Sequence, residues 1–405
     1  MKTQKIKSND IKGATIILSV LFTITISTII ISFLAKGYRP SLKKGISLKS
    51  TGLISATSTP KSASVYINNR LITATDDTIN LPPDNYHVEI HKDGFLPWKK
   101  DLTVRKEIVT STNATLFKSS PALKPISLSG AINPVISPDH SKILFTVASA
   151  SASKNNGLYL VDLNNLALHL NKITPKQISH NSFNINWSKA SFEFSPNSKQ
   201  LLVQLRQNTH YLFSLEEIPN FPQNIYDISY KLDNIKQEWQ QQEQQIVQEK
   251  IAKLPDSLLD FISTKSAQQI QFSSDENKIF YLAKQNGQLK QNIITPPPAQ
   301  SQQKQQRQIK TGNYYVYDLK DDTNFLIESA SNISSLNWIP NSNNLIFVKN
   351  QQIKTIEYDH NNENTLFAGD FDSQLVTPTN NGQQIITITS AYQGSPKNLY
   401  LINIR

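Results

Sequence analysis

The sequence predicts a mainly β protein that begins with one long apolar helix. Three observations lead to this fold class. A turn followed by an apolar strand recurs from residue 121 onward, first at residues 137–145. Short strands separated by turn residues fill residues 52–118. An uncharged run extends over residues 14–35. Together these patterns predict a transmembrane helix, a small β-sandwich and a repeated array of sheets.

The uncharged run has 22 residues and follows a polar tail at residues 1–13. As a helix it is about 33 Å long, enough to cross the hydrocarbon core of a membrane. Its Ser and Thr hydroxyls can bond to helix carbonyls, so they are tolerated in lipid. The alternative is a cleaved signal peptide, but Phe33-Leu34-Ala35 lacks the small-x-small cleavage pattern. We therefore predict an uncleaved transmembrane helix at 14–35 and a basic linker at 36–51.

Composition excludes several classes of function. The chain of 405 residues has 41 basic and 31 acidic side chains, a net charge of +10, but the basic residues are scattered rather than clustered. We therefore expect no nucleic-acid partner. The chain has no Cys, which excludes disulfides, Cys-ligated zinc and thiol catalysis.

Residues 52–118 predict about seven short strands, the scale of a small β-sandwich. Strict alternation places Tyr86, Val88 and Ile90 on one face of a strand. The stretch resembles the PEGA domain. The matching parts are residues 58–68, residues 81–88, and Lys92-Asp93-Gly94-Phe95 with Trp98.

The chain departs from the PEGA pattern at two places. The signature tetrapeptide reads Pro60-Lys61-Ser62-Ala63, without its Glu and Gly, and Asp84 stands where the family has Gly after two prolines. The resemblance implies the sandwich fold and no catalytic residues. It also implies an extracytoplasmic body, because PEGA domains resemble surface modules of exported proteins. The N-terminus is then cytoplasmic.

The turn-and-strand repeat organises the rest of the chain. Pro presets φ at the turn, and Asp or Asn tolerates the bend after it. One such unit cannot bury its own apolar face, so the repeat predicts a stacked or radial array. The copies are residues 137–145, 195–203, 273–281, 339–347 and a looser fifth at 377–386. Later aromatic-aliphatic strands accompany them at 157–163, 210–215, 313–319, 352–358 and 398–404. This pattern resembles WD40-like and TolB-like β-propeller blades, without the Trp-Asp dipeptide.

Two insertions explain why the repeats are unevenly spaced. Residues 227–264 have helical spacing and predict a removable helical insertion. Residues 285–310 are rich in Gln and Pro and predict a disordered loop. Without them, residues 121–405 have about 44 residues per blade for five blades. The sequence therefore predicts a five-bladed propeller, with six blades as the alternative.

The two ends of this array are expected to meet. Residues 398–404 correspond to the third strand of a blade, and residues 123–128 precede the first repeat without an earlier blade to join. We predict that 123–128 pairs with 398–404 as the outer strand. Pro125 removes one donor, which an outermost strand tolerates.

Few residues are candidates for a site. His87, Glu89 and His91 share one face of a strand, and two His with a carboxylate can hold zinc. The favoured interpretation is instead the solvated face of the sandwich, so we expect no metal ion. No serine-hydrolase elbow, HExxH motif or phosphate loop occurs. We therefore expect no catalytic residues and no cofactor.

The helical insertion carries the candidate for partner binding. An apolar stripe could dock on another protein, or it could pack against its own propeller. The stripe consists of Ile228, Leu232, Ile235, Trp239 and Ile246.

These observations predict a bacterial-type, membrane-anchored, non-catalytic protein of the cell envelope. It would present a propeller to a protein or to a cell-envelope polymer. The alternatives are a glycan-active enzyme with paired carboxylates at the propeller axis, and a membrane scaffold that faces the cytoplasm.

Overall fold

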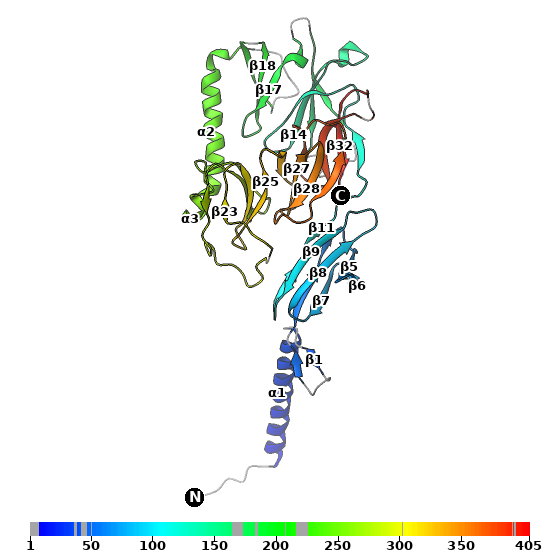
Figure 1. Cartoon of the computed structure of the whole chain (residues 1–405), viewed down its shortest axis with the longest axis vertical. Helices are drawn as coiled ribbons and strands as arrows, with labels where there is room; N and C mark the ends of the chain where they lie inside the picture. Colours follow the sequence, from blue (N-terminus) through cyan, green and yellow to red (C-terminus); the bar gives the residue numbers. More distant parts are fainter. Residues whose placement is uncertain are drawn as a thin grey trace. The chain divides into compact units, whose positions relative to one another are not determined.

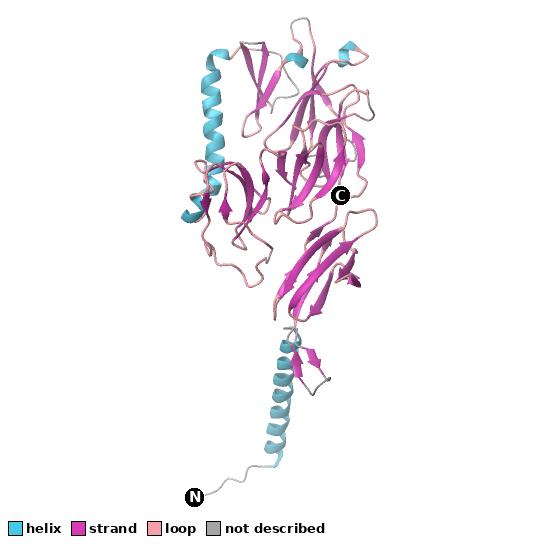
Figure 2. Cartoon of the chain, viewed as in Figure 1, coloured by secondary structure: helices cyan, strands magenta, loops and turns pink. Residues whose placement is uncertain are grey.

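The structure, a computed structural model, describes residues 8–35, 39–41, 47–49, 51–163, 173–182, 185–206, 208–215, 226–301, 303–390, 392 and 394–405. The protein is mainly β, with 44% strand and 14% helix, which confirms the predicted class (Figure 2). The chain divides into two compact units. Unit 1 comprises Met1–Lys92 and Pro97–Thr115, and unit 2 comprises Asp93–Leu96 and Leu116–Arg405.

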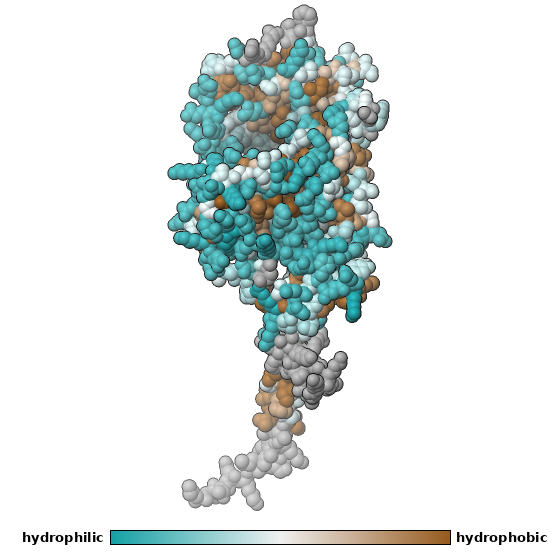
Figure 3. Space-filling view, in the orientation of Figure 1, coloured by the Kyte–Doolittle hydropathy of each residue, from teal (hydrophilic) through white to brown (hydrophobic). Residues whose placement is uncertain are grey.

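The N-terminal helix α1 (Ser8–Ala35) begins earlier than the apolar run. Its side chains are described from 16 to 32, and its large apolar residues are exposed there, such as Leu18 at 72% (Figure 3). Thr23, Thr25 and Thr28 each donate a 2.8 Å hydrogen bond to a carbonyl one turn earlier, as expected for hydroxyls in an apolar helix. Where side chains are described, no helix combines the length and apolarity needed to span a membrane. After α1, β1 (Arg39–Ser41) pairs with β2 (Ser47–Lys49).

The rest of unit 1 consists of short strands in two main sheets. The strands are β3 (Gly52–Ala56), β4 (Ser58–Thr59), β5 (Ser64–Ile67), β6 (Arg70–Ala74), β7 (Asp77–Leu81), β8 (Asp84–His91), β9 (Trp98–Val104), β10 (Val109–Ser111) and β11 (Ala114–Thr115). One sheet has the order β6-β5-β8-β9 and the other β10-β3-β7, while β11 pairs with β4. Val88 and Ile90 are fully buried, and Trp98, opposite Ile90, is 2% exposed. The predicted alternation along β8 therefore places an apolar face in the core.

In its described residues, unit 2 contains five antiparallel sheets of three or four strands, which we number along the chain, and one further two-stranded pair (Figure 1). Sheet 1 is β13 (Ile132–Ile136), β14 (Lys142–Val147), β15 (Gly157–Asp162) and β16 (Lys176–His180). Sheet 2 is β17 (Ser191–Phe194), β18 (Gln200–Arg206) and β19 (Thr209–Ser214). Sheet 3 is β20 (Ala267–Phe272), β21 (Lys278–Ala283), β24 (Asn313–Asp318) and β25 (Thr323–Ser329). Sheet 4 is β26 (Ser334–Trp338), β27 (Asn344–Lys349), β28 (Gln352–Glu357) and β29 (Asn364–Ala368). Sheet 5 is β30 (Thr377–Pro378), β31 (Gln384–Thr389), β32 (Asn398–Asn403) and β12 (Ala122–Pro125). Each repeated turn joins the first strand of a sheet to its second, as the sequence pattern predicts.

Sheet 5 is built from both ends of unit 2. Strand β12 pairs antiparallel with β32, with Leu123 opposite Ile402 and Pro125 opposite Tyr400. Beyond β12, the Ile126 amide donates to the Leu399 carbonyl at 2.7 Å. The predicted pairing of 123–128 with 398–404 is therefore confirmed.

The apolar clusters show which sheets are neighbours. One cluster joins sheets 1 and 5, a second joins sheets 1 and 2, a third joins sheets 4 and 5, and a fourth joins sheets 3 and 4. The sheets therefore follow one another in the order 2-1-5-4-3. Among the described clusters, none contains side chains of both sheet 2 and sheet 3.

The helical segment lies between these two sheets. It comprises α2 (Leu232–Ile251) and α3 (Asp256–Leu259). Ile251, Leu258 and Ile262 are at most 1% exposed and share a cluster with Tyr281 and other side chains of sheet 3. The helical prediction is confirmed. Residues 227–264 supply part of the core, so we expect that they are not a removable insertion.

The Gln- and Pro-rich segment 285–310 has a described structure except at residue 302, which lies outside the described residues, and this structure contradicts the predicted disorder. Its strands β22 (Gly287–Gln288) and β23 (Gln308–Ile309) pair with each other. Leu289 and Ile309 enter the sheet 3 core. Arg307 forms a buried 2.7 Å ion pair with Asp322, which also accepts from the backbone amide of Asn292. A few buried contacts of this kind hold a loop whose composition is mostly polar. The described residues of unit 2 also form short 3₁₀ turns at Ser153–Asn155, Trp187–Lys189 and Ser229–Lys231.

Candidate functional site

The repeated turn is one local structure used five times. Its fourth residue is left-handed in every copy, with φ between 54° and 62° at His140, Ser198, Glu276, Ser342 and Gly382. In the first copy, Ser137 Oγ donates to Asp139 Oδ1 at 2.6 Å and accepts from the Lys142 amide at 2.9 Å. In the fifth copy, Thr379 Oγ1 occupies the place of Ser137 Oγ. The sequence alignment of the fifth copy on Thr377-Pro378 is therefore wrong by two residues.

Hydrogen bonds connect the turns of neighbouring sheets. The Asp139 amide donates to Ser198 Oγ at 3.1 Å, joining sheets 1 and 2. The Asp275 amide makes the equivalent 3.0 Å bond to Ser342 Oγ, joining sheets 3 and 4. His140 Nδ1 lies 2.9 Å from Thr377 Oγ1 of sheet 5. In the described part of unit 2, no such bond joins the turn of sheet 2 to that of sheet 3.

Helix α2 bridges this interval. Near its start, Lys236 Nζ lies 3.4 Å from Glu193 Oε2 of β17. Near its end, Lys250 Nζ lies 3.0 Å from Glu276 Oε1, in the turn of sheet 3, and 5.5 Å from the ring centre of Phe272. The helix therefore runs from sheet 2 to sheet 3 (Figure 1).

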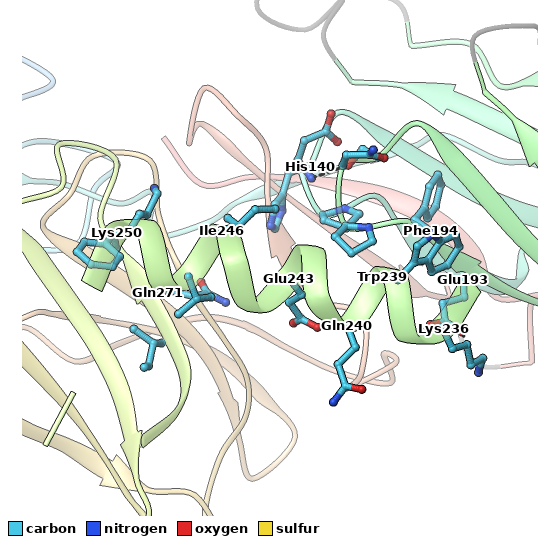
Figure 4. A pocket seen from close by; sticks show the side chains of 18 residues that line it. His140, Glu193, Phe194, Lys236, Trp239, Gln240, Glu243, Ile246, Lys250 and Gln271 are labelled. Carbon is cyan, nitrogen blue, oxygen red and sulfur yellow. Dashed lines mark hydrogen bonds and ion pairs between the residues drawn. The ribbon is translucent and has the colours of Figure 1, made fainter. Parts of the chain in front are cut away.

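A cavity of about 900 Å³ lies along this helix (Figure 4). Its wall consists of the turn of sheet 1 at 138–140, parts of sheet 2 at 193–194 and 196–198, and the end of β20 at 270–272. The remaining side is the face of α2 between Lys236 and Lys250. Several strands and one helix thus converge on the cavity, which makes it the candidate functional site.

Two titratable side chains of the first turn set the charge at one end of the cavity. Burial alone would raise the pKa of Asp139, but hydrogen bonds from Ser137 and Ser141 outweigh it and lower that pKa. Burial lowers the pKa of His140. At neutral pH, Asp139 is therefore ionised and His140 is uncharged.

The lining of the cavity combines carboxylates with apolar side chains. Asp139, Glu193 and Glu243 supply carboxylates to the wall. A glycosidase needs one carboxyl group with a raised pKa to act as acid. Asp139 has the opposite shift, and Glu193 pairs with Lys236. Trp239 and Phe194 add apolar surface beside these polar groups.

The candidate partner-binding stripe separates into three environments. Trp239 is 5% exposed within unit 2, in agreement with the alternative of packing against its own domain. Ile246 is 47% exposed and lines the cavity. Ile228, Leu232 and Ile235 are half-buried.

The candidate metal residues lie together on the outer face of unit 1. His87 Nε2 lies 3.0 Å from Glu89 Oε1, and His91 Nε2 lies 2.7 Å from Glu89 Oε2. Lys99 Nζ lies 3.0 Å from Glu89 Oε1, and Asp101 Oδ1 lies 2.7 Å from His87 Nδ1. The side chains thus bond to one another across β8 and β9. In the described part of the chain, no group of three or more His, Asp or Glu side chains is arranged to hold a metal ion.

This network should make the stability of unit 1 depend on pH. Hydrogen bonds that the His87 ring donates to the carboxylates of Asp101 and Glu89 raise the pKa of His87. Burial opposes ionisation of Glu89, but bonds from Lys99 and the two histidines lower its pKa to about 2. The His87 contribution is complete below about pH 6.5, its unfolded value, and is lost as pH rises through the raised folded value. The Glu89 contribution is complete above its ordinary pKa of 4.5 and is lost as pH falls toward 2.

We therefore expect Glu89→Gln to lower the melting temperature of unit 1 most between about pH 5 and 6.5 and less outside this range. Thermal unfolding followed by the fluorescence of buried Trp98 measures this. Asp76→Asn, which removes an exposed ion pair with Lys61, is the control and should leave the pH profile unchanged. A difference between wild type and Glu89→Gln that does not vary with pH would contradict the prediction.

Sequence reasoning missed most residues of the cavity. It interpreted Pro138, Asp139, Pro196 and Asn197 only as turn formers. Their recurrence in a repeat was the available signal, because equivalent turns of a radial array lie at one end of the sheets. Nothing in the local pattern indicated that α2 would lie against two of these turns.

The comparison with protein families bears on unit 1. Residues 51–120 match the PEGA domain. The β-sandwich of unit 1 is therefore PEGA-like, as the sequence resemblance implies. The PEGA match covers a small part of the chain, and no curated protein matches the chain.

Solved structures similar to the chain include two proteins. TolB from Acinetobacter baumannii is 13% identical, with 80% of this chain and 60% of that chain covered and a TM-score of 0.23. An acylaminoacyl peptidase from Pyrococcus horikoshii is 9% identical, with 69% and 39% covered and a TM-score of 0.21. The chain thus spans less than two thirds of either protein. At these scores neither structure indicates what this chain binds.

Proposed function

We propose that this chain is a membrane-anchored, non-catalytic binding protein of the cell envelope. In this proposal α1 is the anchor, the PEGA domain follows it, and unit 2 is a five-bladed β-propeller. The body lies outside the cytoplasm and the N-terminus inside it. The uncharged run at 14–35 and the PEGA match at 51–120 support this arrangement.

The packing of unit 2 supports the propeller. Five sheets follow one another through shared apolar clusters, and β12 joins the last sheet to the start of the unit. Helix α2 occupies the interval between sheets 2 and 3, where another blade would otherwise stand. The array therefore uses a helix in place of a sixth sheet.

The cavity along α2 is the observation that carries the binding function. Its volume of about 900 Å³ is in the range of ligand sites. Its wall combines aromatic, amide and charged side chains, and the lowered pKa of Asp139 is the opposite of the shift that a catalytic acid needs. A segment of a partner protein or of a cell-envelope polymer is the expected ligand.

A pair of matched variants of the full-length protein tests this function. Ile246→Asp places a charge on the cavity wall, and Gln242→Asp places the same charge on an exposed site of the same helix that does not line the cavity. After crosslinking in intact cells, we expect the wild type and Gln242→Asp to retain the same envelope component. Ile246→Asp should lose it.

Two results would contradict the proposal. Equal retention by both variants would place binding elsewhere on the molecule. Crosslinks to cytoplasmic components alone would reverse the orientation and favour the cytoplasmic scaffold.

A further inference from the structure

The two ends of α2 are attached to unit 2 with unequal strength. At the C-terminal end, Ile251, Leu258 and Ile262 are at most 1% exposed and belong to the apolar cluster of sheet 3. Leu254 adds to the same cluster. This end cannot separate from sheet 3 without exposing a core.

The N-terminal half of α2 makes far fewer buried contacts with unit 2. Trp239 is its one fully buried side chain among the described residues of the helix before Ile251. The Lys236–Glu193 ion pair is more than half exposed on both sides, and such pairs contribute little. The Ile228 amide donates to the His210 carbonyl of β19 at 2.8 Å.

The start of α2 is also weakly capped. Lys231 is its N-cap residue, and no side chain there accepts from the first free amides. A positive charge at this end opposes the helix dipole, and Asp233 in the first turn compensates only in part. The first turns should therefore open before the rest of the helix.

The middle of α2 faces the cavity instead of packing on protein. Residues 240–246 are exposed, and Gln240, Glu243 and Ile246 line the cavity at helical spacing. Figure 4 shows this face of the helix between Trp239 and Lys250. Movement of the N-terminal half therefore changes access to the cavity directly.

We propose that α2 is a strap over the cavity, fixed at sheet 3 and released at sheet 2 when Trp239 leaves its site. Release proceeds by local unfolding of the first turns, because the chain before the helix stays bonded to the β18–β19 hairpin. The strap controls entry whatever the ligand is. This proposal concerns a motion of the chain and does not depend on the proposed function.

Hydrogen exchange of the full-length protein tests the unequal attachment. Amides of 232–243 should exchange through local opening of the first turns. This opening should be at least 100-fold more frequent than the opening of 247–251 or of β21. Trp239→Ala should increase opening at 232–243 by about 100-fold and leave β21 unchanged. Trp239→Phe should give a smaller increase, which preserves the test if the alanine variant does not fold. Gln241→Ala, at an exposed site of the helix, is the matched control and should change neither region.

A single thiol reports access to the cavity, because the chain has no Cys. Ser198 is 4% exposed and lines the cavity, so Ser198→Cys should react slowly with a maleimide. Adding Trp239→Phe should accelerate that reaction about as much as it accelerates exchange at 232–243. The proposal is overturned if α2 exchanges only together with β21. It is also overturned if the thiol reacts at the same rate with and without Trp239.

Discussion

Replacing residues 232–262 by a flexible Gly/Ser linker should abolish cooperative folding of unit 2. The segment brings four large aliphatic side chains into the core of sheet 3, at Ile251, Leu254, Leu258 and Ile262. Each large-to-small change at such a site costs about 2–5 kcal/mol, and the whole stability of a domain is about 5–15 kcal/mol. Removing all four side chains should therefore cost more free energy than the whole stability of unit 2. Denaturant unfolding followed by the fluorescence of buried Trp187 and Trp338 measures the loss.

A matched pair of point variants separates packing from chain connectivity. Leu258 is fully buried, so Leu258→Ala should lower the free energy of unfolding by about 2–5 kcal/mol. Gln241 is exposed on the same segment, and Gln241→Ala should change the free energy of unfolding by less than about 0.5 kcal/mol. A linker variant that keeps the wild-type denaturation midpoint would show that the segment is a dispensable insertion after all.

Deleting residues 121–129 should be the second most damaging change. It removes β12, leaves β32 as an open edge and takes buried Ile126 from the cluster between sheets 1 and 5. It also removes Ser127, whose Oγ accepts from the Leu399 amide at 2.9 Å. We expect a loss of several kcal/mol of unfolding free energy and a tendency to associate through the open strand. Chemical denaturation and light scattering measure the two effects.

The controls for this deletion are two alanine variants. Ile126→Ala should reproduce part of the loss, about 2–5 kcal/mol, because Ile126 is 6% exposed. Leu123→Ala should cost less, because Leu123 is 39% exposed on the outer strand. If the deletion leaves the unfolding midpoint unchanged, the pairing of β12 with β32 does not stabilise unit 2.

The sequence predicted the parts of this protein that depend on neighbouring residues. Each copy of the turn contains its own hydrogen-bonding side chains, so Ser137, Asp139 and their equivalents indicated the turns without tertiary information. Alternation in β8 predicted the buried face of Val88 and Ile90 in the same way. The pairing of β12 with β32 was also predictable, because one strand of a regular array lacked its neighbour.

Some contacts in this protein join side chains of different elements and leave no local signal in the sequence. The loop at 285–310 has a disordered composition, yet Arg307 finds Asp322 and Leu289 finds the core. The face of β8 with His87, Glu89 and His91 had the spacing of a metal site, but Lys99 and Asp101 of the next strand bond to these side chains. The partner of each of these side chains lies on another element, so no local sequence pattern indicates the contact.

The sequence by itself determined the mainly β class, the turns, the strands and the meeting of the two ends, because each is specified by short-range periodicity and turn chemistry. Only the tertiary structure decided the place of α2. An amphipathic helix will cover any apolar surface of suitable width, so its stripe does not state which surface that is. Here that surface lies in the interval between sheets 2 and 3. The cavity that α2 lines lies in the same interval.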